Sequence, residues 1–128
     1  MVVRSNTRDI GITASLTLVT LDACGPRRIT ELAEMEGVSQ PSMSGVVSGL
    51  ERAGLVERHP DEQERRVVLV AITTSGRRYL VQRRRSSAEM LGRLIATLDD
   101  GEARALLGAV PVLERLSLQA ARRLTLSD

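Results

Sequence analysis

The sequence predicts a mainly α-helical protein with one small β-hairpin. Three observations indicate this fold class: two short helical segments joined by a glycine turn, two β-branched runs around a charged turn, and two long helical segments with apolar stripes. A chain of 128 residues is long enough for one hydrophobic core without a metal or disulfide. We expect three parts: a short N-terminal segment at 1–12, a compact lobe at 13–76 and a helical region at 77–128.

The first element of the lobe is a helix over Thr13–Ala23, with apolar residues at near-helical spacing. Its threonine and valine content leaves a strand over Leu16–Leu21 as the alternative. Gly25 and the proline after it end the element. The next residues, Arg28–Thr30, are expected to form a short third strand beside the hairpin.

Two further helices follow at close spacing. Thr30 is expected to cap a short helix over Glu31–Glu36, which Gly37 ends in a left-handed turn. Ser39 then caps a second helix by accepting the amide hydrogen of Ser42, with a proline in the first turn. A helix, a short turn containing glycine and another helix are typical of helix-turn-helix proteins, in which the second helix enters the major groove of DNA.

The second helix has two contrasting faces. The core stripe is expected to contain Met43, Val46, Val47, Leu50 and Ala53. The opposite face contains Pro41, Ser44, Gly45, Ser48, Gly49 and Arg52. Glycine costs about 1 kcal/mol relative to alanine inside a helix, so a face of this kind is unusual for mere solvation. Small residues allow close approach to another surface.

The hairpin has strands at 55–58 and 67–72 and a polar tip at 59–66. From Arg58 to Arg78, five arginines face three acids, which makes the hairpin and its exit locally basic. All 18 basic residues of the chain are arginine, although the net charge is only +2.

Two long helices are expected after the hairpin, at 75–98 and 101–124. Pro111 lies inside the second one and removes a backbone hydrogen bond, so we expect a kink or a break there. Both helices have apolar stripes that no further strand covers. A second copy of the chain is the simplest covering surface.

These motifs together resemble the DNA-binding core of the MarR family of winged-helix transcription regulators. The matching features are the Leu-Ala of the first short helix, Ser-Gln-Pro-Ser at the start of the second, Leu-Glu-x-x-Gly-Leu-Val after it, and Thr-x-x-Gly after the hairpin. The resemblance is close over 13–76 and loose over 77–120. It implies a homodimeric repressor of a pseudopalindromic operator in double-stranded DNA, released by a small-molecule effector bound between the lobe and the dimer helices.

Three departures from the family pattern matter. Glu64 stands where the wing usually has a second aspartate, and Gly45 stands where a basic residue is more common. The segment at 1–12 is shorter than the family's first dimer helix, of which it is expected to be a remnant. We therefore expect phosphate binding to depend more on the wing.

The candidate DNA-binding residues come from the second helix and the wing. In the helix they are Ser39, Gln40, Pro41, Ser42, Ser44, Gly45 and Arg52. Gln40, Ser42 and Ser44 are expected to contact base edges, and Pro41 a thymine methyl group. In the wing they are Arg65 and Arg66, on phosphate or in the minor groove, with Asp61 and Glu64 orienting them.

Other residues receive simpler interpretations. The run Arg83–Arg85 is expected to be a solvated face, and His59 a residue at a strand end. One histidine and one cysteine do not make a metal site, and no cofactor is expected. Cys24 is expected to have a structural role rather than that of an oxidisable switch.

The alternative to DNA binding is a winged helix that binds another protein. An enzyme is excluded because no nucleophile, base and orienting acid can be assembled, and no glycine-rich phosphate loop is present. No apolar run reaches about 18 residues, so no membrane segment is expected. The polar start and the single cysteine indicate a cytoplasmic protein.

Overall fold

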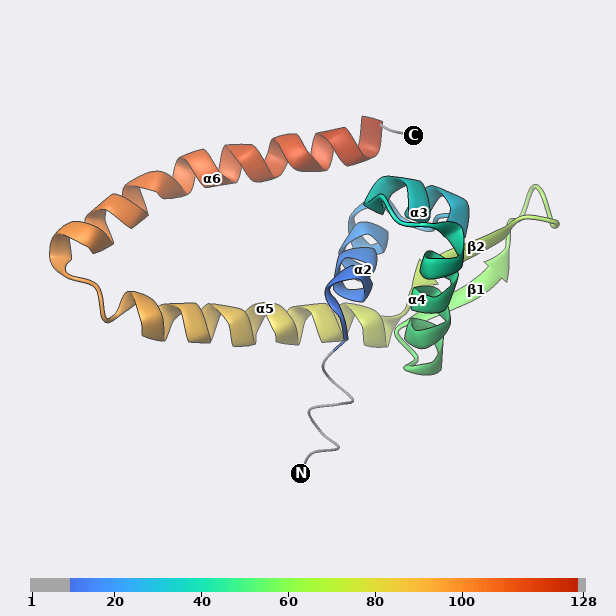
Figure 1. Cartoon of the computed structure of the whole chain (residues 1–128), viewed down its shortest axis with the longest axis horizontal. Coiled ribbons are helices and arrows are strands. Elements are labelled where there is room, and N and C mark those ends of the chain that lie inside the picture. Colours follow the sequence, from blue (N-terminus) through green and yellow to red (C-terminus); the bar gives the residue numbers. More distant parts are fainter. Residues whose placement is uncertain (1–9, 127–128) are drawn as a thin grey trace, which may run out of the picture. The chain divides into compact units, whose positions relative to one another are not determined.

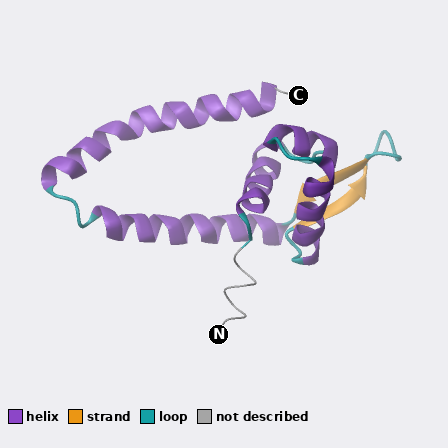
Figure 2. Ribbon diagram, in the orientation of Figure 1, coloured by secondary structure: helices purple, strands orange, loops and turns teal. Residues whose placement is uncertain are grey.

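A computed structural model describes residues 10–126, apart from the side chains at 121 and 124–126. The helices and strands in this part of the chain are α2 (Ile12–Cys24), α3 (Ile29–Glu36), α4 (Gln40–Arg52), β1 (Val56–Pro60), β2 (Val68–Ile72), α5 (Thr74–Ile95) and α6 (Asp100–Leu126) (Figures 1 and 2). The predicted fold class is confirmed, and the strand alternative for Leu16–Leu21 is wrong. Most of the predicted segment 1–12 lies outside the described residues.

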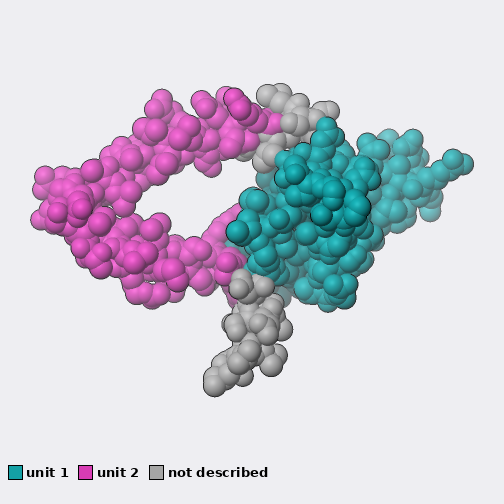
Figure 3. Space-filling model, viewed as in Figure 1, with its two compact units in different colours: residues 1–80 teal, residues 81–128 magenta. Residues whose placement is uncertain are grey.

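The chain forms two compact units, Met1–Leu80 and Val81–Asp128 (Figure 3). The first unit extends beyond the predicted end of the lobe at Gly76 because Leu80 is buried in its core. That core is built from aliphatic side chains of every element in the unit. Its buried members are Leu18, Leu21, Leu32, Ala33, Met43, Val47, Leu50, Leu55, Val56, Val70, Ile72 and Leu80.

The start of α3 differs from the prediction, while its end agrees with it. The residue at the N-cap is Arg28, whose amide donates to Glu31 Oε1 at 2.9 Å, so Thr30 lies inside the helix and does not cap it. A carboxylate in the first turn satisfies an otherwise unpaired amide and thus favours the earlier start. At the other end Gly37 has a φ of 67°, as predicted, and lets the chain turn toward α4.

The wing is the antiparallel hairpin of β1 and β2, paired from Val56 with Ile72 to Pro60 with Val68. β1 extends farther toward the tip than predicted, because His59 and Pro60 belong to it rather than to the turn, whereas β2 begins at Val68, one residue later than predicted. The expected third strand at Arg28–Thr30 is wrong. A single bridge forms one residue earlier, where Arg27 and Val70 exchange two backbone hydrogen bonds of 3.0 and 2.8 Å.

The second unit contains most of α5 and all of α6. Asp99 caps α6: its Oδ1 accepts from the Glu102 amide at 2.8 Å, and Glu102 Oε1 accepts from the Asp99 amide at 3.1 Å. Of the kink or break predicted at Pro111, the break is wrong, because α6 continues through the proline as one helix, which is curved in Figure 1. The proline leaves one carbonyl, that of Leu107, without its helical amide partner, while long helical segments on both sides remain bonded.

Candidate nucleic-acid interface

The N-terminal turn of α4 is exposed and capped as the sequence predicts. Ser39 Oγ accepts from the Ser42 amide at 3.2 Å and donates to Ser42 Oγ at 2.9 Å. Because Ser42 Oγ accepts this bond, its own hydroxyl hydrogen remains available to an incoming acceptor. Gln40 and Pro41 are exposed on the same turn. This end of α4 therefore presents small polar groups to solvent.

The two faces of α4 separate largely as expected. Met43, Val47 and Leu50 are buried and Val46 is half-buried. Ala53 was expected in this stripe, but it is exposed at the C-cap, where the helix has already ended. The outer face contains the exposed Pro41, Gly45 and Arg52, together with the half-buried Ser44, Ser48 and Gly49.

In addition to Arg52 of the helix itself, Arg58 of β1 places a second long cationic side chain against α4. Its Nη2 donates to Ser48 Oγ at 3.0 Å, and its Nε lies 3.3 Å from Glu51 Oε1. Residue-type patterns within α4 did not reveal this residue. The alternation within β1 contained the signal, because Arg58 lies two residues after the buried Val56 and therefore shares the strand face that packs on the helices.

The tip of the wing displays Arg65 and Arg66, both exposed. Asp61 Oδ1 accepts from the Gln63 amide at 2.9 Å and so shapes the turn. Among the described residues, no ion pair joins Asp61 or Glu64 to these arginines. The structure thus places the predicted wing residues in one loop, but Asp61 and Glu64 form no ion pair with Arg65 or Arg66.

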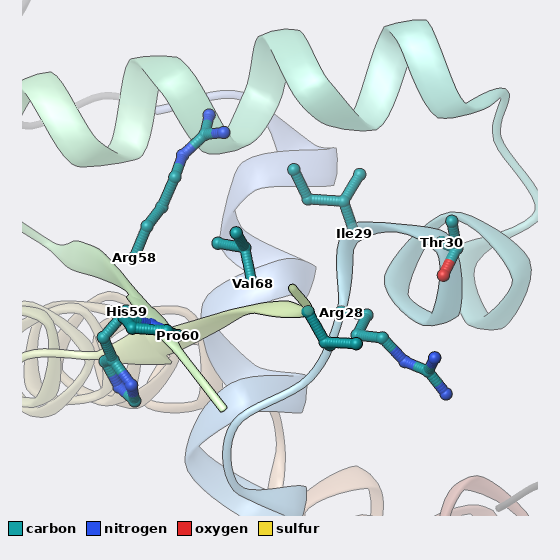
Figure 4. Close-up of a pocket in the computed structure, with 8 residues that line it drawn as sticks. Arg28, Ile29, Thr30, Arg58, His59, Pro60 and Val68 are labelled. Carbon is teal, nitrogen blue, oxygen red and sulfur yellow. The ribbon is translucent and has the colours of Figure 1, made fainter. Parts of the chain in front are cut away.

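A groove of about 580 Å³ lies between the start of α3 and the wing strands. Its lining residues are Arg28, Ile29, Thr30, Arg58, His59, Pro60, Val67 and Val68. In Figure 4, Ile29 and Val68 lie in the middle, while the side chains of Arg28 and Arg58 extend away from each other at the two ends. The groove therefore combines an apolar centre with a cationic group at each end.

A second feature that the sequence did not reveal is a carboxyl group at the helix-turn-helix corner. Thr17 Oγ1 donates to Glu36 Oε2 at 2.7 Å, which joins α2 to the last residue of α3. Burial raises the pKa of Glu36, and the hydrogen bond from Thr17 opposes that rise. The other carboxyl oxygen, Oε1, is buried without a hydrogen-bond partner.

Three further candidates complete the description. His59 is exposed in β1, Cys24 is half-buried as a free thiol at the end of α2, and Arg83–Arg85 are exposed on α5. Within residues 10–126, no three His, Cys, Asp or Glu side chains gather as metal ligands would. None of the described helices has the length and apolar content needed to span a membrane.

A helix-turn-helix formed by α3 and α4, followed directly by a hairpin wing, defines the winged-helix class of transcription regulators. Residues 12–68 match the model of the MarR family. The chain is also 32% identical over 99 residues to the HTH-type transcriptional regulator Mb0904 of Mycobacterium bovis, covering 77% of this chain and 69% of the relative. This chain belongs to the MarR family of transcription regulators, which are DNA-binding proteins without enzymatic activity.

Solved structures agree with this fold. RV1404 from Mycobacterium tuberculosis is 28% identical, with a TM-score of 0.73 and coverage of 85% of this chain and 74% of that one. A MepR variant from S. aureus, solved with a bound oligodeoxyribonucleotide, is 24% identical, with a TM-score of 0.68 and coverage of 88% and 83%. At this identity the second comparison concerns the fold alone.

Proposed function

We propose that this protein is a homodimeric repressor that places one α4 helix per subunit in successive major grooves of a pseudopalindromic operator. The observations that support this most directly are the exposed, capped first turn of α4 and the two exposed arginines at the wing tip. Half-site centres then lie roughly 34 Å apart, one turn of DNA. The similarly folded MepR variant was solved with an oligodeoxyribonucleotide.

Within this proposal, specificity comes from the first turns of α4. Gln40, Ser42 and Ser44 contact base edges, and Pro41 lies against a thymine methyl group. Gly45 permits close approach of the helix to the groove, and the Ser39 cap holds the first turn in place. Affinity comes from arginines on phosphates, namely Arg52 of α4 and Arg65 and Arg66 of the wing, whose turn is shaped by Asp61 and Glu64.

The homodimer is supported by apolar side chains that the single chain leaves in solvent. On α2 they are Ile12, Leu16 and Val19; on α5, Met90, Leu91 and Leu94; and on α6, Leu106, Leu107, Val110, Val112, Leu113, Leu116 and Leu118. Ile12 is 82% exposed and Leu107 70% exposed. Apolar surface of this extent is typical of an association surface. Sedimentation equilibrium of the purified chain tests the assembly directly.

The effector that releases DNA is proposed to be a small amphipathic acid. We place it in the groove between α3 and the wing rather than between the lobe and the dimer helices, because Ile29 and Val68 can contact an apolar group there. Its carboxylate would compete with Glu31 for Arg28 or with Glu51 for Arg58. Because residues of both wing strands line this groove, a ligand bound there would shift the wing and with it Arg65 and Arg66.

The salt dependence of binding to duplex DNA distinguishes this function from a protein-binding winged helix. Neutralisation of phosphates releases counterions, so affinity must fall steeply between about 50 and 200 mM salt. Fluorescence anisotropy with a labelled genomic fragment gives the slope. A flat salt dependence, or no binding at 50 mM salt, would favour the protein-binding alternative.

A further inference from the structure

The end of α4 is joined to the turn that follows it by backbone hydrogen bonds. The Gly54 amide donates to the Glu51 carbonyl at 2.9 Å, and the Leu55 amide donates to the Leu50 carbonyl at 3.0 Å. The carbonyls of the same two turn residues both accept from Thr73. Thr73 Oγ1 donates to Gly54 O at 2.7 Å, and the Thr73 amide donates to Leu55 O at 3.0 Å.

Thr73 also caps α5. Its Oγ1 accepts from the Gly76 amide at 3.0 Å, and its carbonyl accepts from the Arg77 amide at 3.0 Å. Gly76 is buried, and a Cβ there would overlap the Leu55 carbonyl oxygen and lie 2.6 Å from Ile72 Cγ1. The first turn of α5 therefore lies against the backbone of the turn after α4, an approach that only glycine permits.

These contacts make one continuous connection from the last turn of α4 to the first turn of α5. From there α5 runs as a single helix of 22 residues to Ile95. It passes Leu80, which is 5% exposed in the core of the first unit. Farther along it exposes three of the apolar residues assigned above to the dimer interface, Met90, Leu91 and Leu94.

We propose that Thr73 and Gly76 are positioning residues that fix the angle between α4 and α5, and thereby set the half-site spacing that the dimer accepts. This inference rests on the proposed function, because it requires two α4 helices on one DNA. Neither residue contacts DNA in this account. Their effect on DNA binding passes through the hydrogen bonds to Gly54 and Leu55.

The test uses Thr73→Val, which keeps the size of the side chain and removes the hydroxyl, with Thr73→Ser as the matched control that keeps it. The probe is the inverted repeat enriched from random duplexes by the wild-type protein, together with versions whose spacer is one or two base pairs shorter or longer. Wild type and Thr73→Ser should prefer the enriched spacing by about tenfold or more, and Thr73→Val by about threefold or less.

A role confined to stability would lower the unfolding midpoint of Thr73→Val and leave its spacing preference unchanged, and that result would overturn the inference. Uniform weakening at every spacing would overturn it as well. Thr73→Ala, which removes the hydroxyl without adding bulk, is the second variant in case Thr73→Val does not fold, and it should broaden the preferred spacing in the same way; an unchanged preference would overturn the inference. If the wild-type protein enriches no inverted repeat, the homodimeric repressor itself is rejected, which is a distinct outcome.

Discussion

Arg58 in the first strand of the wing donates from Nη2 to Ser48 Oγ on α4, at 3.0 Å. The same side chain lies beside Glu51 on the next turn of the helix, with Nε 3.3 Å from Oε1. One residue of the wing thus contacts two successive turns of the proposed recognition helix. The relative orientation of α4 and the wing, the two elements proposed to contact DNA, is therefore set by contacts within the protein.

Replacing Arg58 should uncouple the wing from α4. Solvent weakens the ion pair between Arg58 and Glu51, because their side chains are 31% and 44% exposed. The hydrogen bond from Arg58 to Ser48 is a separate contact, for which we expect a coupling energy of about 1 kcal/mol. A double-mutant cycle of Arg58→Ala and Ser48→Ala, measured by urea unfolding, gives this value. Strictly additive effects of the two substitutions would show that the hydrogen bond has no energetic role.

Replacing Arg66 should weaken binding to every duplex to a similar degree. A wing arginine on phosphate contributes affinity without sequence information, so Arg66→Ala should reduce the slope of log K against log salt by about one. Arg104→Ala, an exposed arginine of α6, is the matched control for loss of one charge. An unchanged salt slope for Arg66→Ala would show that Arg66 does not bind phosphate.

Replacing Gln40 should relax sequence preference rather than general affinity. A glutamine that forms paired hydrogen bonds with a base contributes about 1–3 kcal/mol of discrimination at one base pair. Competition among single-base variants of the enriched repeat should show the loss at one position in each half-site for Gln40→Ala. Gln82→Ala on the exposed surface of α5 serves as the control. Equal loss at all positions would contradict base contact by Gln40.

The buried carboxyl of Glu36 makes a prediction about stability and pH. Burial raises the pKa of Glu36 in the folded protein above its ordinary value of 4.5. In the pH range just above 4.5, Glu36 therefore keeps a proton in the folded protein that it has released in the unfolded chain. Stability is therefore lost as pH rises through this window. Glu36→Gln should unfold at a higher temperature than wild type at pH 7, and the difference should shrink toward pH 4.

Glu34→Gln, which alters an exposed acid on the same helix, is the control for Glu36→Gln. A gain for Glu36→Gln that does not change between pH 4 and pH 7 would show that titration of the buried carboxyl is not its cause.

The sequence predicted those features that depend on local patterns. Helical periodicity, the Ser39 cap and the left-handed Gly37 were all visible because each involves residues within one turn of chain. The contacts of Arg58 with α4 and of Thr73 with Gly54 were not visible, since both join residues on different elements. The sequence shows Thr73 and Gly76 only as a Thr-x-x-Gly motif. The close packing of Gly76 against the Leu55 backbone explains why the motif needs a glycine.

The start of α3 could not be predicted from the capping preference of single residues. Thr30 is a good capping residue by type, yet Arg28 occupies the cap because Arg27 is bridged to Val70 of β2 and Glu31 accepts from the next amide. The long-range bridge fixes where the chain leaves the sheet. Residue preference alone does not contain that information.

Protection of the enriched repeat from methylation by dimethyl sulfate tests whether α4 lies in the major groove. The reagent modifies guanine N7, which lies in the major groove, so it reports whether α4 occupies that groove. With one α4 helix per subunit in the major groove, guanines in two segments about one helical turn apart should be protected. Saturating protein that leaves guanine N7 fully reactive in both segments would contradict the account.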